Sequence, residues 1–241
     1  MSDRSKLKFK RVLFKVSGEA LMGDQGFGID PTVTARIAKD IGEAVKLGVR
    51  VSVVVGGGNI FRGVALAAKG ADRVTGDHMG MLATVMNAMA LKMAINESGL
   101  KAVVLSAIAM PEFCETFSQR ALDENLDAGN VVVFAAGTGN PYFTTDTGAA
   151  LRACEMKADA LFKGTQVDGV YSADPKKDPN AKRYDTITHD QMLEQGLEVM
   201  DLSAVTLTKD ANIPIVVFSL HQEGEFAKIL QGKGHATIVT N

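Results

Sequence analysis

The stretch that decides the fold is VVVFAAGTGNPYFTTDT, residues 131–147. Residues 131–136 are β-branched or apolar without alternation, which predicts a strand buried on both faces of a parallel sheet. Residues 148–156 follow with a helical pattern. The glycine-rich turn between them therefore presents free backbone N–H groups at a helix N-terminus, where an anion such as phosphate binds favourably. The alternative interpretation is an ordinary polar loop between a strand and a helix.

The same order of strand, glycine turn and helix recurs along the chain. Further apolar strands are predicted at residues 9–16, 49–55, 102–106, 160–163, 215–218 and 237–239. After the first strand, Asp30 and Pro31 supply an N-cap and a first helical residue, and the helix ends at Leu47 before Gly48. This alternation predicts an α/β fold whose mostly parallel sheet carries helices on both faces and binds ligands beyond the carboxyl ends of its strands.

Composition limits the classes of protein to consider. A chain of 241 residues that is 46% hydrophobic can bury one sizeable core, so we expect a single domain over residues 1–241. The net charge of -2, with dispersed basic residues, argues against a nucleic-acid partner. Cys114 and Cys154 lack metal-ligand spacing and are interpreted as reduced thiols. The charged start of the chain lacks the apolar stretch of a signal peptide, so we expect a cytoplasmic protein.

The segment from Asp77 to Ser98 is apolar almost all round. It contains Asn87 and Lys92, and its uninterrupted apolar run is shorter than the roughly 20 residues that a bilayer requires, which argues against a membrane span. A helix of this kind is more often covered on both sides, by its own core and by a second subunit, which predicts a dimer interface. The alternative is a helix wholly enclosed within one subunit.

Common nucleotide-binding motifs are missing from the sequence. It contains no G-x-x-x-x-G-K-[ST], and no G-x-G-x-x-G opens its first helix, so neither a P-loop nor a dinucleotide fingerprint is supported. What remains is a set of strand-end turns: KVSG at 15–18, GGGNIFRG at 56–63, residues 137–147, and KGT at 163–165. Three of the four carry a cation: Lys15, Arg62 and Lys163.

These turns suit phosphoryl transfer, in which catalysis consists mainly of positioning and positive charge. The four histidines are scattered, and no Ser/His/Asp, Cys/His or metal-binding arrangement is evident. A monophosphate acceptor, whose second pKa is near ~6, is already ionised and needs no nucleophilic side chain.

Taken together and in order, the motifs resemble those of the bacterial uridylate (UMP) kinases of the amino-acid kinase family. The resemblance rests on KVSGE (15–19), VVGGGNIFRG (54–63), DRVTGDHMGM (72–81), GTGNPYFTTD (137–146), VDGVYSADP (167–175) and VMDL (199–202). It extends over nearly the whole chain. The segments DHMGM and GTGNP separate UMP kinases from the acetylglutamate, aspartate and carbamate kinases of the same family.

The resemblance implies a three-layer α/β/α sandwich and transfer of the ATP γ-phosphate to UMP, with Mg²⁺ as cofactor, in pyrimidine nucleotide synthesis. It also implies a cytoplasmic homohexamer built from dimers. Related enzymes are regulated at the position of residues 23–28 by GTP, so GTP and UTP are possible effectors.

The resemblance also implies roles for individual residues. The catalytic set would be Lys15, Arg62, Asp146 and Lys163, with Asp146 either orienting the lysines or assisting Mg²⁺. UMP would contact Gly57, Asp77, Thr138, Gly139, Asn140, Pro141, Tyr142, Phe143, Thr144 and Thr145. ATP would contact Lys15, Val16, Ser17, Gly18, Gly58, Arg62, Thr165, Tyr171 and Asp174. No residue is assigned as a protein ligand of a metal.

Several of these residues also have a purely structural interpretation. Asp77 stands where a helix start is expected and would then be a cap, Tyr171 suits packing, and Asp201 suits a helix N-cap. Residues 164–166, Gly-Thr-Gln, depart from the Ala-Thr-Asn or Ala-Thr-Lys more usual in the family, which leaves the contact of Gln166 open.

Two other functions compete with UMP kinase. One is a nucleotide-binding sensor on the same fold that has lost turnover, which the retention of Lys15, Arg62 and Asp146 opposes. The other is a kinase acting on a carboxylate or carbamate, which the UMP-type segments oppose.

Overall fold

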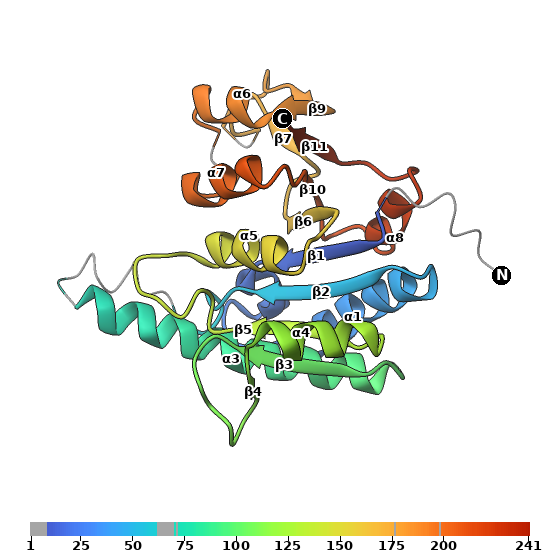
Figure 1. Cartoon of the computed structure of the whole chain (residues 1–241). Helices are drawn as coiled ribbons and strands as arrows, with labels where there is room; N and C mark the ends of the chain where they lie inside the picture. Colours follow the sequence, from blue (N-terminus) through green and yellow to red (C-terminus); the bar gives the residue numbers. More distant parts are fainter. Residues whose placement is uncertain (1–8, 62–69, 71, 176, 198) are drawn as a thin grey trace.

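A nine-stranded sheet crosses the molecule in the order β4-β3-β5-β2-β1-β6-β10-β11-β9 (Figure 1). The computed structural model describes residues 9–61, 70, 72–175, 177–197 and 199–241. Its strands are β1 Arg11–Val16, β2 Arg50–Val55, β3 Ala102–Ser106, β4 Glu115–Thr116, β5 Val131–Ala135, β6 Ala160–Thr165, β9 Thr186–Thr188, β10 Ile215–Ser219 and β11 Thr237–Thr240. Within this described sheet, β10 and β11 are antiparallel and the other neighbours are parallel. The prediction of a mostly parallel sheet is confirmed.

Helices cover both faces of the sheet and complete three layers (Figure 1). One layer contains α1 Pro31–Lys46, α3 Arg73–Glu97 and α8 Glu225–Leu230. The other contains α4 Gln119–Asp127, α5 Thr145–Glu155, α6 His189–Glu194 and α7 Leu202–Asp210. Each layer has its own apolar core against one face of the sheet. The three-layer α/β/α arrangement implied by the sequence is therefore confirmed.

The pleat of β1 decides which of its side chains face the layer of helices that contains α5. Val12, Phe14 and Val16 pack into the core beneath α1, whereas Leu13 packs into the core beneath α5. Because side chains alternate along a strand, Lys15 points to the same face as Leu13. The carboxyl end of β1 thus places one lysine on the α5 side of the sheet.

Three local predictions need correction. Helix α3 begins at Arg73 rather than at Asp77, because Asp72 caps it by accepting a 2.7 Å hydrogen bond from the Thr75 amide. The α5 helix begins at Thr145 rather than at residue 148, because the Thr144 side chain caps it. The segment from 168 to 184 is rich in Asp, Pro and Lys, a composition that predicts loop or turn, but it holds the antiparallel strands β7 Val170–Tyr171 and β8 Arg183–Tyr184.

Gly23, Gly26 and Gly28 predict a loop after β1, but the structure has a 3-10 helix, η2, at Gly18–Gln25. Among the helices that the structure describes, none has both the length and the apolar character needed to cross a bilayer.

Candidate active site

The centre of the candidate site is a carboxylate held between two lysines. Lys15 and Lys163 are register partners on the neighbouring parallel strands β1 and β6. Asp146 lies in the first turn of α5, with Oδ1 2.7 Å from Lys15 Nζ and Oδ2 2.7 Å from Lys163 Nζ. Lys163 Nζ also donates a hydrogen bond to the Val199 carbonyl oxygen. Three residues that lie far apart in sequence thus form one cluster.

The cluster carries one net positive charge in a largely buried setting. Burial opposes ionisation of Asp146, but the attraction of Lys15 and Lys163 outweighs it and holds the pKa of that carboxyl below its ordinary value. Burial, and then repulsion by Lys15, lower the pKa of Lys163. Two ammonium groups with one carboxylate leave one positive charge uncompensated, so the cluster can bind an anion such as phosphate.

The glycines of the adjacent strand-end turns are required by close backbone contacts. A Cβ atom on Gly18 would lie 2.6 Å from the Gly56 carbonyl oxygen and 2.7 Å from the Gly58 nitrogen. A Cβ atom on Gly57 would lie 2.8 Å from the Gly80 carbonyl oxygen of α3. Since real Cβ atoms do not approach so closely, these positions have to be glycine whatever ligand binds there. The turns after β1 and β2 therefore pack directly on each other.

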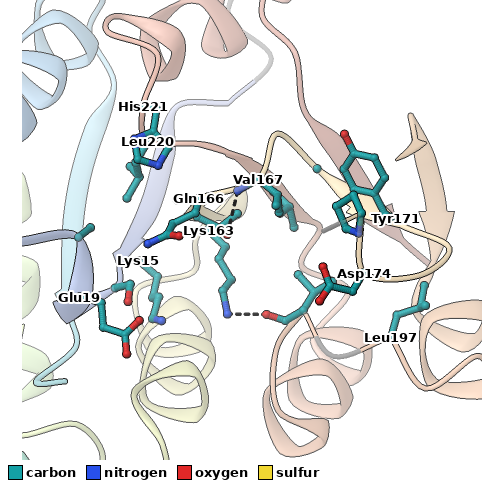
Figure 2. A pocket seen from close by; sticks show the side chains of 18 of the residues that line it. Lys15, Glu19, Lys163, Gln166, Val167, Tyr171, Asp174, Leu197, Leu220 and His221 are labelled. Carbon is teal, nitrogen blue, oxygen red and sulfur yellow. Dashed lines mark hydrogen bonds between the residues drawn. The ribbon is translucent and has the colours of Figure 1, made fainter. Parts of the chain in front are cut away.

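A cavity of about 1020 Å³ opens beside the lysine pair (Figure 2). Of the residues predicted to bind ATP, Lys15, Ser17, Thr165, Tyr171 and Asp174 line it, and so does Lys163. Gly18 and Gly58 meet at the glycine turns described above, and Val16 is buried within β1. Figure 2 shows Lys15 and Lys163 side by side, with Tyr171 and Asp174 on the side of Lys163 that faces away from Lys15. The cavity is large enough for a nucleotide-sized ligand.

Tyr171 and Gln166 both face this cavity. The Tyr171 hydroxyl donates a 2.6 Å hydrogen bond to Asp168 Oδ1, which raises the pKa of Tyr171. The Tyr171 side chain is only partly buried, so the interpretation as a core packing residue does not hold. Gln166 lines the wall despite its departure from the family pattern.

The acceptor segment, residues 137–145, is fastened to α3 at Asp77. The Tyr142 amide donates a 2.7 Å hydrogen bond to Asp77 Oδ2. Arg73 Nε lies 2.8 Å from both Asp77 carboxylate oxygens, and the Arg73 guanidinium lies over the Tyr142 ring at 5.5 Å. Tyr142 has a φ of 73°, a strained value for a residue with a side chain, and these contacts hold it. Asp77 is thus a loop anchor and not a helix cap.

The rest of this segment forms tight internal turns. The Gly139 amide donates to the Ala136 carbonyl at 2.9 Å, and the Asn140 amide donates to Thr138 Oγ1 at 3.2 Å. Pro141 follows, and the Tyr142 and Phe143 side chains are exposed. Thr145 Oγ1 lies 3.4 Å from the position of a Cβ on Gly56, so this segment meets the glycine turn.

Asp201 acts as a structural cap. It accepts a 2.7 Å hydrogen bond from the Ala204 amide at the start of α7, as predicted, and also bonds the hydroxyls of Thr144 and Thr147. This carboxylate therefore ties α7 to the start of α5, the helix that carries Asp146.

Arg62, predicted to contact ATP and to act in catalysis, lies outside the described residues. Conversely, the sequence interpretation overlooked Arg73. Arg73 and Asp77 are four residues apart, a spacing that indicates an ion pair when both residues lie in one helix. The predicted helix began at Asp77 and therefore left Arg73 outside.

The described residues provide no cluster of three or more His, Cys, Asp or Glu side chains that would hold a metal ion. Asp146, the carboxylate nearest to both lysines, is engaged by them.

Comparison with known proteins identifies close relatives of the chain. Residues 10–219 match the sequence profile of the amino acid kinase family. The chain is 65% identical over 233 residues to the uridylate kinase of Brucella anthropi, covering 97% of both chains. It is 66% identical over 233 residues to the uridylate kinase of Rhizobium meliloti, again covering 97% of both.

Solved structures give the same answer for the fold. The crystal structure of UMP kinase from Bacillus anthracis has a TM-score of 0.92 at 36% identity, over 96% of each chain. The crystal structure of UMP kinase from Ureaplasma parvum has a TM-score of 0.92 at 37% identity, over 98% of this chain and 100% of that one. The resemblance stated from the sequence motifs is confirmed.

Proposed function

The chain belongs to the amino acid kinase family, and from that premise we propose that it transfers the γ-phosphate of ATP to UMP, giving ADP and UDP. The observation that carries this proposal is the pair of lysines sharing Asp146 between the nucleotide-sized cavity and the acceptor segment. The protein is an enzyme of the nucleoside monophosphate kinase class, as its uridylate kinase relatives are.

ATP occupies the cavity in this proposal, with its phosphates toward Lys15 and Lys163 and its base and ribose toward Thr165, Tyr171 and Asp174. The lining of the cavity supports this orientation, since the Tyr171 ring and Asp174 lie to one side of the lysine pair. The glycine turns after β1 and β2 pack on each other at the ends of those strands, and backbone amides in turns of this kind suit phosphate oxygens. Arg62 is assigned to the same phosphates from its place in the sequence motif.

UMP lies on the opposite side of the lysine pair, over the segment 138–145 and Gly57, with its ribose at Asp77. The contact of Thr145 with the glycine turn and the anchoring of Tyr142 by Asp77 support a pocket between α3 and the start of α5. The N-terminus of α5 adds a favourable dipole for the acceptor phosphate.

In the transfer step, a phosphate oxygen of UMP attacks the γ-phosphorus of ATP, and the bond from that phosphorus to the β–γ bridging oxygen breaks. The acceptor oxygen is already ionised near neutral pH, so no general base is required. Lys15 and Lys163 stabilise the charge on the migrating group, while Asp146 holds both ammonium groups in position.

Mg²⁺ enters this proposal with ATP. Mg²⁺ keeps several water ligands and binds through substrate phosphates with few carboxylates. When bound, the ion neutralises charge on the β- and γ-phosphates. Of the two roles considered for Asp146, its double ion pair favours orientation of the lysines.

A homo-oligomer is the second part of the proposal. On α3, five large apolar side chains are exposed: Met79, Leu82, Met86, Met89 and Met93. A helix enclosed within its own chain would not expose them, so this face, called here the α3 outer face, supports a dimer interface. A homohexamer of such dimers, with GTP and UTP as effectors, remains a prediction from the sequence resemblance. A single domain over residues 1–241 and a cytoplasmic location likewise remain predictions from the sequence.

The test is to incubate the full chain with Mg·ATP and, separately, UMP, CMP, dTMP, acetylglutamate, aspartate or carbamate, and to measure ADP release. We expect UMP to give the highest rate. Lys163→Met should lower that rate by about 10²-fold or more through lost charge stabilisation, whereas Lys46→Met, an exposed lysine on α1, should not change it. ADP release with UMP no faster than without an acceptor would exclude the function, and a higher rate with a carboxylate or carbamate would favour the competing kinase class.

A further inference from the structure

Two polar side chains are buried on the inner face of α3, a helix whose other buried residues are apolar or glycine. They are Thr84 and Asn87, 3% and 0% exposed, and they are spaced three residues apart so that they lie on one face. Burying a polar group is costly unless its hydrogen bonds are satisfied. Their partners therefore indicate what the two side chains are for.

Asn87 forms a closed amide pair with Asn59 beneath the glycine turn after β2. Asn87 Nδ2 donates to Asn59 Oδ1 at 2.7 Å, and Asn59 Nδ2 donates back to Asn87 Oδ1 at 3.0 Å. The second proton of Asn87 Nδ2 goes to the Gly56 carbonyl oxygen at 2.6 Å, and that of Asn59 Nδ2 to the Gly28 carbonyl oxygen at 2.8 Å. All four amide N–H groups are used.

Thr84 supports the other strand-end turn in a comparable way. Its hydroxyl donates to the Met81 carbonyl oxygen at 2.7 Å and accepts the Ala136 amide at 2.9 Å. Ala136 is the residue at which β5 passes into the acceptor segment, and its φ of 62° is unusual for a residue with a side chain. The Thr84 hydroxyl therefore holds a strained backbone position directly before Gly137.

One helical face thus bonds to both the glycine turn after β2 and the acceptor segment. The Gly56–Asn59 turn carries Gly57, assigned to UMP, beside Gly58, assigned to ATP, and the segment after Ala136 is assigned to UMP. Helix α3 connects this turn and this segment through side chains spaced three residues apart. Phosphoryl transfer depends on in-line placement of the two nucleotides, and a misplacement of about 1 Å can cost 10²-fold in rate. Neither Thr84 nor Asn87 lines the cavity, so any effect of these side chains on the rate passes through the backbone turns.

We propose that Thr84 and Asn87, with Asn59, are positioning residues that set the distance and orientation between the glycine turn after β2, which meets both nucleotides, and the acceptor segment. This assignment rests on the proposed function for its catalytic meaning. Asn87 bonds directly to the Gly56–Asn59 turn. Through Asn59 it also contacts Gly28, whose backbone amide donates to the Asn59 carbonyl at 3.0 Å.

The test compares variants of the full chain that remove single hydrogen bonds with matched controls elsewhere. Thr84→Val removes the hydroxyl at nearly constant volume, and Thr84→Ser retains it. The control for this pair is Thr208→Val, because Thr208 is equally buried but bonds only within α7, to the Ala204 and Val205 carbonyls. Asn87→Ala is matched with Asn130→Ala, because Asn130 is buried and paired with Asn125 at the opposite end of β5.

For Thr84→Val we expect hydrogen exchange at the Ala136 amide to accelerate at least about 10-fold and the KM for UMP to rise by about the same factor. Thr84→Ser should stay within about twofold of wild type. Asn87→Ala should lower kcat at least about 10-fold with a smaller change in the KM for UMP. The double variant Asn59→Ala with Asn87→Ala should have a kcat no lower than that of Asn87→Ala alone, because the two amides act as one unit.

The proposal is overturned if, in folded variants, Thr84→Val and Asn87→Ala lose no more activity than Thr208→Val and Asn130→Ala. A purely structural role would lower the thermal midpoints of all four variants without this difference in KM and kcat. Failure of the wild-type chain to phosphorylate UMP would instead exclude the proposed function. In that case the exchange rate at Ala136 in Thr84→Val still decides whether the hydroxyl holds the turn.

Discussion

Lys15 and Lys163 stand opposite each other in register on the adjacent parallel strands β1 and β6, with Asp146 bridging their two ammonium groups. Two buried cations on neighbouring strands repel each other, and one carboxylate compensates only half of their charge. The cluster thus holds one net positive charge, which in the proposed function faces the phosphate that is transferred. This arrangement makes the site sensitive to pH, to loss of Asp146 and to bound nucleotide.

The first prediction concerns alkaline pH. Because the pKa of Lys163 is lowered from 10.5, its ammonium loses its proton at a lower pH than an exposed lysine would, and kcat/KM for ATP should fall on that alkaline side. Lys163→Arg should have lower activity, but its alkaline fall should move to higher pH because a guanidinium stays charged to a pKa of roughly 12 or above.

The sign for stability is opposite to the sign for activity. Folding favours the neutral form of Lys163, so its contribution to the free energy of unfolding should rise as pH increases through its lowered pKa toward 10.5. Profiles of kcat/KM against pH for wild type and Lys163→Arg check the prediction. If kcat/KM falls at the same alkaline pH in wild type and Lys163→Arg, then deprotonation of Lys163 is not the cause of that fall.

The second prediction concerns Asp146→Asn. The change keeps the shape but leaves two buried cations uncompensated, and breaking a buried pair in this way costs about 3–5 kcal/mol in other proteins. We expect a loss of unfolding free energy approaching that range, together with a lower kcat. ATP should raise the thermal midpoint of the variant more than that of wild type, because its phosphates replace the missing negative charge.

Acid pH gives a further check on the same residue. Because the pKa of Asp146 is lowered on folding, its contribution to the free energy of unfolding is fully present above pH 3.8. That contribution is lost as pH falls through the lower pKa of the folded state, and Asp146→Asn should not show this loss. Denaturant unfolding between neutral and acid pH measures it. Asp127→Asn, which breaks an exposed ion pair with Arg50, is the control and should cost about 0–1 kcal/mol. Equal losses for both variants would contradict the prediction.

The third prediction concerns Arg73 and Asp77. Arg73→Ala removes the guanidinium that bonds both Asp77 oxygens and lies over Tyr142, so the acceptor segment should lose its defined position. We expect the KM for UMP to rise about 10-fold while the KM for ATP stays nearly unchanged. Asp77→Asn should act in the same direction.

Steady-state kinetics with each nucleotide varied in turn measure this effect. Arg120→Ala, which removes an exposed i,i+4 pair with Glu124 in α4, serves as the control and should leave both constants unchanged. A shift confined to the KM for ATP would show that the donor and acceptor sides are assigned the wrong way round.

The fourth prediction concerns the α3 outer face. Met86 and Met93 are 53% and 60% exposed, and charge at either would disrupt an apolar contact between two copies. Met86→Glu combined with Met93→Glu should lower the mass measured by light scattering at micromolar concentration. Leu202→Glu, an exposed apolar residue on α7, should not change it. An unchanged mass for the double variant would place the interface elsewhere.

The strand-end turns show how far sequence patterns reach. Residues 131–136 predicted a buried strand because each residue in that run favours β-structure or avoids water, and the structure has β5 there. The helix boundaries were less well predicted, because the choice between Asp72 and Asp77 as a cap depends on which carboxylate reaches a free amide. In the folded chain Asp77 bonds instead to Tyr142, a contact between residues 65 positions apart.

The sequence by itself determined the alternating fold, the family and the identity of the polar residues at the strand ends, because those properties depend on local pattern and on motif order. Tertiary structure alone decided that Lys15 and Lys163 face each other around Asp146, that Arg73 holds Asp77, and that Thr84 and Asn87 link the two turns. These relationships follow from strand order, register and helix packing, which bring together side chains that are far apart along the chain.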